Sequence, residues 1–281
     1  MISKLAHLTR FQLNLADSSL ITDSSVAILA DNIKELKNIH QLGIGFNNCD
    51  KITEAGIVLI ASLAAEFEKM TEWSFSFEGS KVVKNSTLKT IADKLPNLKE
   101  LKGLYLNFSH CQEITNEGIG FIGERISKLT TISKLMIHTE GCEKITDSGV
   151  SSICKSIFPL RGLSKISIDF SSCPKVSGTC IFALGQSLSN KKKLQDVVIK
   201  LRKTPISSDN MSWISNAIST LPNLNSLILD LSDCISIGDP TLRELKKGIE
   251  KHENLKIFEI VLDQCPKLTD LGFTYLFGGL Q

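Results

Sequence analysis

The order of apolar and polar residues predicts a strand, a turn and a helix in the middle of the chain. From residue 135 to residue 140 apolar and polar positions alternate, which indicates a strand with one buried face. Thr146 and Asp147 follow, and their side-chain oxygens suit the free backbone N–H groups at the start of a helix. Apolar residues then recur at helical spacing between residues 150 and 157, before Pro159 stops the helix.

The same unit recurs along the whole chain with a period of 31 residues, shortened once to 30. The anchors of the copies, aligned on Cys142, are Ser18, Cys49, Ser80, Cys111, Cys142, Cys173, Thr204, Cys234 and Cys265. The shorter copy lacks one residue in the turn Pro205-Ile206-Ser207. Nine copies account for the sequence, which predicts one repeat domain over residues 1–281 instead of separate domains.

The columns around the anchor share the signature Leu-x-Leu-x-x-Cys-x-x-Ile-Thr-Asp-x-Gly-[Ile/Val]. This signature resembles leucine-rich repeats, and among them the cysteine-containing repeats of F-box-type proteins and the ribonuclease-inhibitor-like repeats. The resemblance implies an α/β leucine-rich-repeat solenoid, or horseshoe, of strand–turn–helix units. Neighbouring strands lie about 4.8 Å apart, whereas packed helices need roughly 8–10 Å. The stack must therefore bend, with a parallel sheet on the concave face and the helices on the convex face.

Leucine-rich repeats generally bind partners through outward residues of their strands, and the alternation predicts which residues these are. We expect the concave contacts to come from Tyr105, Asn107, Met136, His138, Glu140, Asp169, Val198, Lys200, Arg202, Ile228 and Asp230. The apolar members of this set are Tyr105, Met136, Val198 and Ile228. Apolar residues at outward positions are typical of interface anchors, and also of ordinary scattered surface side chains.

Two other surface patterns allow more than one interpretation. The charges of Asp169, Lys200 and Asp230 alternate in sign on neighbouring strands. This pattern is compatible with ion pairs that hold the strands in register and with a polar stripe that recognises a partner. The run at residues 191–193 is three lysines, which predicts a solvated turn or a contact for an acidic partner. The second and third strands carry only Gly and Ser at two successive outward positions, so we expect a smooth, shallow floor there.

Six cysteines share the anchor column. They could form a metal-binding or redox array, or a buried ladder of thiols that donate weak hydrogen bonds. A zinc site needs clustered ligands such as Cys-x-x-Cys, which the sequence lacks. The replacements Ser18, Ser80 and Thr204 favour the ladder, because a hydroxyl can replace a thiol as donor but is a poor thiolate ligand or disulfide half. Cys154 and Cys180 lie off the column and are predicted as small core residues. We predict no metal and no cofactor.

The remaining sequence features favour a binding protein over an enzyme. Cys111 follows His110 but belongs to the inward column, and His138 is predicted on the surface, so no nucleophile has a base in reach. The net charge of +2 is too small to imply nucleic acid or an acidic membrane as partner. There is no run of 18 apolar residues, and residues 1–11 lack the apolar core of a secretory signal. We predict a cytoplasmic protein with reduced thiols.

The leading functional prediction is a non-catalytic scaffold that binds another protein on its concave sheet. By resemblance, two further functions stay open: substrate recognition in an F-box-type ubiquitin ligase, and regulation of an enzyme or GTPase. Solenoids usually carry polar capping units, and neither end of this sequence reads as one. We therefore expect either a fragment of a longer repeat array or end-to-end self-association.

Overall fold

In the computed structural model, which describes residue 5 and residues 7–278, the strands form one parallel sheet in chain order. Its nine strands are β1 (Arg10–Asn14), β2 (Gln41–Gly45), β3 (Glu72–Ser76), β4 (Gly103–Asn107), β5 (Lys134–His138), β6 (Lys165–Asp169), β7 (Asp196–Lys200), β8 (Ser226–Asp230) and β9 (Ile257–Val261). The predicted stack of parallel strands is confirmed. Part of the segment analysed for a secretory signal, residues 1–4 and 6, lies outside the described residues, as do residues 279–281.

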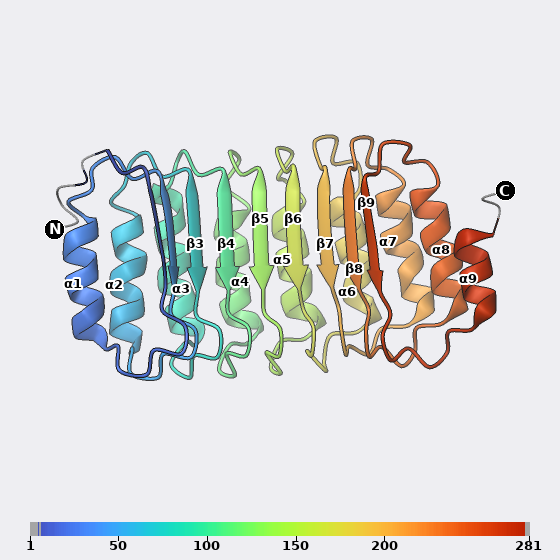
Figure 1. Cartoon of the computed structure of the whole chain (residues 1–281), viewed down its shortest axis with the longest axis horizontal. Helices are drawn as coiled ribbons and strands as arrows, with labels where there is room; N and C mark the ends of the chain where they lie inside the picture. Colours follow the sequence, from blue (N-terminus) through green and yellow to red (C-terminus); the bar gives the residue numbers. More distant parts are fainter. Residues whose placement is uncertain (1–4, 6, 279–281) are drawn as a thin grey trace.

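Each strand is followed by a helix, and the helices form a second layer. Within the described residues the helices are α1 (Asp23–Ile33), α2 (Glu54–Ala64), α3 (Asn85–Lys94), α4 (Asn116–Ile126), α5 (Asp147–Ile157), α6 (Gly178–Leu188), α7 (Met211–Ile218), α8 (Asp239–Ile249) and α9 (Asp270–Phe277). Figure 1 shows them behind the sheet and spread over a wider span than the strands. The sheet therefore lies on the concave side, as predicted. In the shortened seventh unit, the 3-10 turn η3 (Ser208–Asn210) precedes a helix of eight residues.

The pairing register confirms the outward and inward columns predicted from the alternation. On neighbouring strands Tyr105 lies between Ser74 and Met136, in the outward column nearest the middle of the strands. The inward columns form a continuous core along the sheet. Its largest fully buried side chains include Phe46, Trp73, Phe75, Phe77, Phe108 and Phe170.

The anchor thiols form a ladder of hydrogen bonds that joins successive units. Cys142 Sγ donates to the carbonyl of Phe108 in the preceding unit at 3.2 Å. Equivalent bonds to the preceding unit start from Cys49, Cys111, Cys173, Cys234 and Cys265. The predicted donor role is confirmed for these cysteines, and Cys154 and Cys180 are buried as predicted. Thr204 differs, because its hydroxyl donates to Leu201 of its own unit at 2.5 Å.

A second ladder joins the helix starts. Thr146 is the N-cap of α5 as predicted, and its hydroxyl accepts from the N–H of Ser148. Asn116, the first residue of α4, contacts this cap from the preceding unit: its Oδ1 accepts from the Thr146 N–H at 2.9 Å and its Nδ2 donates to Thr146 Oγ1 at 2.9 Å. Asp147 binds Ser177 of the next unit at the equivalent atoms, but both of its oxygens accept: Oδ1 from the Ser177 N–H and Oδ2 from the Ser177 hydroxyl. At these helix starts the polar residue after the cap therefore bonds to the cap of the following unit.

Lys191 contradicts the prediction of a fully solvated lysine turn. Its side chain is buried, and its Nζ donates to the carbonyls of Ile157, the last residue of α5, and Leu160, both at 3.0 Å. The last carbonyls of a helix lack intrahelical partners and carry partial negative charge, so an ammonium group is favourable there. Lys192 and Lys193 are exposed, as predicted.

Candidate binding groove on the concave sheet

The concave sheet is hollowed over β2 and β3, where the outward side chains are small. Adjoining hollows of about 290 and 470 Å³ lie there, and both are lined by Gln12, Ser74 and Tyr105. We call them together the concave groove. Its floor follows the predicted smooth surface and consists of Gly43, Gly45, Ser74 and Ser76.

Tyr105 and Met136 line the groove on the side of β4 and β5. Both side chains are half-buried, and the Tyr105 ring meets the His138 ring edge-on, with 5.3 Å between the ring centroids. Burial, and then the Glu78 carboxylate, raise the pKa of the Tyr105 phenol. The phenol therefore stays neutral at pH 7 and can both donate and accept a hydrogen bond. A supported aromatic ring of this kind suits an interface anchor.

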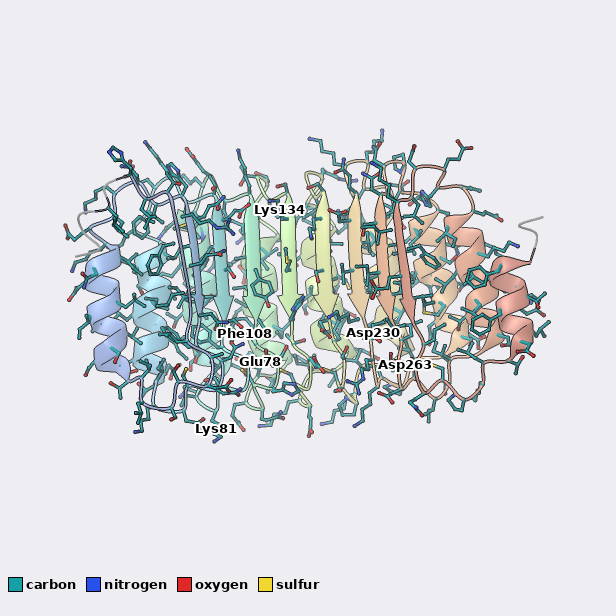
Figure 2. All side chains as sticks on the ribbon, in the orientation of Figure 1. Glu78, Lys81, Phe108, Lys134, Asp230 and Asp263 are labelled. Atoms are coloured by element: carbon teal, nitrogen blue, oxygen red, sulfur yellow. The ribbon has the colours of Figure 1, made fainter. Side chains whose placement is uncertain are left out.

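The two ends of the groove carry different polar groups. Beyond the end of β3, Glu78 Oε2 accepts from Asn107 Nδ2 at 3.1 Å and from Asn47 Nδ2 at 3.4 Å. At the start of the strands, Lys134 Nζ and Glu72 Oε1 lie 2.9 Å apart. Figure 2 shows Lys134 and Glu78 toward opposite ends of the strands. A bound chain would meet a carboxylate at one end, an ion pair at the other and the tyrosine between them.

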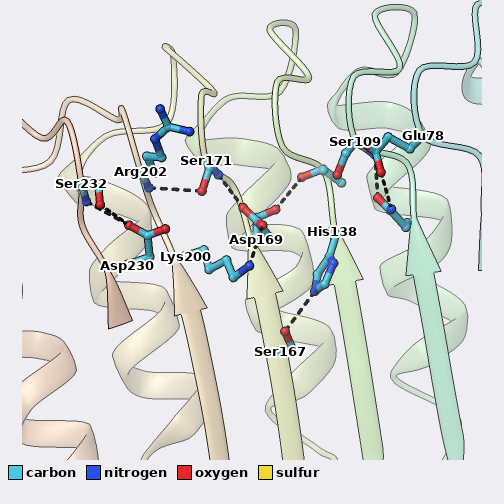
Figure 3. Close-up of polar contacts among 12 residues, drawn as sticks. Glu78, Ser109, His138, Ser167, Asp169, Ser171, Lys200, Arg202, Asp230 and Ser232 are labelled. Carbon is cyan, nitrogen blue, oxygen red and sulfur yellow. Dashed lines mark hydrogen bonds and ion pairs between the residues drawn. The ribbon is translucent and has the colours of Figure 1, made fainter. Parts of the chain in front are cut away.

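Asn107, Asp169 and Asp230 close the turns after their strands, a role that the sequence did not reveal. Oδ1 of Asp169 accepts from the N–H of Ser171 at 3.0 Å, and Oδ1 of Asp230 accepts from that of Ser232 at 3.0 Å (Figure 3). Asn107 makes the same bond two residues ahead. Asn107 and Asp169 are only 6% and 5% exposed. They were predicted as outward contact residues of the concave face, but the structure shows that they are buried. Their polar atoms are drawn down into the turn.

The predicted residues on β7 and β8 lie outside the groove. Lys200 Nζ is 4.0 Å from Asp169 Oδ2, and Arg202 pairs with Asp233 at 2.8 Å. Both cations are substantially exposed, and pairs of this kind contribute about 0.2–1 kcal/mol each. The register must therefore come mainly from the backbone ladder and the apolar core. Half-buried positions on the concave side are also occupied by Glu140, Val198 and Ile228.

His138 and Ser167 form a polar pair on neighbouring strands. His138 Nε2 lies 3.0 Å from Ser167 Oγ, a distance suited to a nucleophile and its base. Burial is the main cause that lowers the pKa of His138. Ser167 is only 6% exposed, however, and the surrounding N–H groups of β5 and β6 belong to the sheet ladder. A substrate carbonyl would thus lack access to the hydroxyl and donors for an oxyanion.

Metal-binding clusters and membrane-crossing helices are not found in the described part of the chain. Its His, Cys, Asp and Glu side chains form no group of three or more that could hold a metal ion. None of its helices has the length and apolar character that crossing a bilayer requires.

The sequence prediction missed part of the groove. Gln12, Glu72, Glu78 and Lys134 line it but were not among the predicted contacts. They occupy outward columns or their continuations, so the alternation could have identified them. The feature that determines where the groove lies is the small size of the outward side chains on β2 and β3. Because of it, the groove lies over the first five strands.

Comparison with known proteins supports the fold. No family model and no curated protein matches the sequence. Among solved structures, a chain in the crystal structure of the Rad7 and Elc1 complex in yeast matches with a TM-score of 0.53 and 14% identity, over 98% of this chain and 74% of that chain. Leiomodin-1 actin-binding site 2 matches with a TM-score of 0.40 and 19% identity, over 52% of this chain and 77% of that chain. With its parallel repeats, this chain is an α/β solenoid of strand–helix units.

Proposed function

We propose that this chain is a non-catalytic interaction scaffold that binds a partner protein in the concave groove. The observation that carries the proposal is a floor of Gly and Ser beside the supported ring of Tyr105 and the flexible side chain of Met136. A floor without bulky side chains lets another backbone approach closely, and aromatic and Met side chains are enriched at interface cores. The Rad7 structure, which contains Elc1 as a second protein, supports a protein partner for this fold.

The test uses the 281-residue chain as bait in affinity purification with mass spectrometry. Tyr105→Ala with Met136→Ala should remove partners that wild type retains, and should weaken a purified partner by more than about 1 kcal/mol. The matched control is Val198→Ala with Ile228→Ala, which truncates the same outward column outside the groove. Circular dichroism verifies that both variants fold. Equal affinity of the partner for wild type and the groove variant would refute the site.

The more specific functions rest on the sequence resemblance. Substrate recognition in an F-box-type ubiquitin ligase predicts co-purification of ligase-core subunits, and regulation of an enzyme or GTPase predicts a partner whose turnover changes on binding. Ladder bonds such as that of Cys142 support the cysteine-containing, ribonuclease-inhibitor-like subclass. We place the protein in the cytoplasm because the cysteines, free and buried in the structure, fit a reducing compartment. Cell fractionation tests that assignment.

A further inference from the structure

Both ends of the described solenoid expose positions that are core elsewhere. The inward side chains of interior strands are 0–2% exposed, whereas Leu13 and Leu15 near the first strand and Ile260 and Leu262 near the last are only partly buried. An apolar hollow of about 400 Å³ lies over Leu13 and Leu15. At the other end Phe273 of α9 is 54% exposed. We call these surfaces the β1 face and the β9 face.

The backbone bonds between units are directional, and the two faces carry opposite halves of them. In the last described pair, Leu231 N–H donates to the Val261 carbonyl at 2.9 Å, as the equivalent residues do between earlier units. The next donor in this series is the N–H of Leu262, at the open edge of β9. The matching acceptor, equivalent to the Val261 carbonyl, is the carbonyl of Asn14 at the open edge of β1.

The thiol ladder is directional too, but it runs in the opposite sense to the backbone bonds. Cys265 Sγ donates to the Leu231 carbonyl of the preceding unit at 3.2 Å. The equivalent of Cys265 in the first unit is Ser18, whose hydroxyl can donate in its place. The equivalent acceptor in the last unit is the carbonyl of Leu262. A donor thus stands on the β1 face and its acceptor on the β9 face.

The ladder of helix caps ends in the same complementary manner. Asp239 Oδ1 accepts from the Thr269 N–H at 2.8 Å and Asp239 Oδ2 from Thr269 Oγ1 at 2.7 Å. In the first unit the equivalent cap is Thr22, whose side chain makes no capping bond. In the last unit the equivalent acceptor is Asp270, an exposed residue at the start of α9. Each face offers what the other lacks.

We infer that the β9 face of one copy binds the β1 face of a second copy, continuing the parallel sheet from chain to chain. The occupant is a second copy because the chain itself already forms this junction between consecutive units, with the same donors, acceptors and apolar columns. A head-to-tail contact joins unlike faces, so each added copy leaves a further face open and assembly is not limited to a dimer.

Steric fit can be judged from the interior units. A Cβ on Gly272 would lie 2.4 Å from Asp239 Oδ1 of the preceding unit, and the first unit carries Ser25 at this column. Cys180 occupies the same column in the sixth unit, beside Asp147, and the ladder bond from the Ser177 N–H persists at 2.6 Å. A small side chain is therefore accommodated, and Ser25 can lie against Asp270 of another copy.

Two charge substitutions at exposed positions block the faces separately without removing core residues. Ile28 of α1 is 66% exposed and lines the hollow on the β1 face, and Phe273 lines the β9 face with Leu262. The variants are Ile28→Lys and Phe273→Lys. The matched control is Phe158→Lys, which places the same charge at a 55% exposed site after α5, in the middle of the solenoid.

Sedimentation velocity and light scattering across a concentration series provide the readout. Wild type and Phe158→Lys should gain mass with concentration, and each blocked variant should stay a monomer. An equimolar mixture of the two blocked variants should form a 1:1 dimer, because one retains a free β9 face and the other a free β1 face. A monomeric wild type, or a mixture that stays monomeric, would overturn the inference. Self-dimerisation of either blocked variant would also overturn it, since that requires contact between like faces.

Discussion

The glycine of the Thr-Asp-x-Gly pattern should be required by a neighbouring unit and not by its own helix. Gly149 is the third residue of α5, and an added Cβ would lie 2.6 Å from Asn116 Oδ1 of the preceding unit. That oxygen accepts from the N–H groups of Thr146 at 2.9 Å and Gly149 at 3.1 Å. Gly149→Ala must therefore displace the Asn116 amide. Beside Cys180 the bond from the cap N–H persists, so the bond expected to be lost is the one from the N–H of residue 149 itself.

The matched control is Gly120→Ala in α4, where an added Cβ meets no atom within 4 Å. Replacing an interior helix glycine by alanine stabilises by up to about 1 kcal/mol, so this variant should gain stability. At Gly149 the same gain is opposed by loss of one hydrogen bond, worth about 0.5–1.5 kcal/mol. The free energies of unfolding of the two variants should thus differ by about 0.5–1.5 kcal/mol, with Gly149→Ala the less stable.

Urea unfolding followed by circular dichroism measures this difference, provided that the slope against denaturant is unchanged. A second comparison, Gly149→Ala in an Asn116→Ala background, removes the crowded oxygen. There the glycine substitution should become neutral or stabilising, as at Gly120. If Gly149→Ala is as stable as Gly120→Ala, or costs the same with and without Asn116, the close approach does not explain the glycine.

Two further predictions concern buried titratable groups. Burial raises the pKa of Cys111, Cys142 and Cys173 to about 12. Ellman's reagent at pH 8 should therefore modify the interior thiols slowly in the native chain and rapidly in the urea-unfolded chain. Fast reaction of the interior thiols in the native chain would contradict this prediction. Burial, and then Arg161, lower the pKa of Lys191 from 10.5 to about 8. Between pH 8 and 10.5 the unfolded chain then binds more protons than the folded chain, so wild type should gain stability relative to Lys191→Met as pH rises through this window, in urea unfolding at pH 7.5 and 9.5. An equal stability difference at both pH values would refute the lowered pKa.

The candidate site was only partly accessible from the sequence. Parity along the strands placed Tyr105 and Met136 in one outward column, and the pairing register agrees. The alternation along a strand shows which face a residue lies on but not how far its side chain is buried. Asp169 was therefore expected to be exposed, although its carboxylate folds back onto Ser171. The Gly and Ser positions on β2 and β3 predicted the smooth floor, but only the structure joined this floor to Tyr105 in one groove. Lys191 was misjudged because a charge run does not show which member reaches a helix end.

The sequence by itself determined the repeat length, the nine strand–helix units, the inward and outward faces and the direction of curvature. These properties are local or periodic: alternation defines a face, helical spacing defines a helix, and the unequal widths of strands and helices bend the stack. Only the tertiary structure decided which atoms join one unit to the next. It showed that the residue before each anchor takes a left-handed conformation, with φ from 53° at Asn48 to 72° at Gly79. It also showed that residues such as Asn116 and Asp147, which follow one cap, bond to the cap of the next unit. Such contacts link atoms about 31 residues apart, and they appear only when the units are stacked.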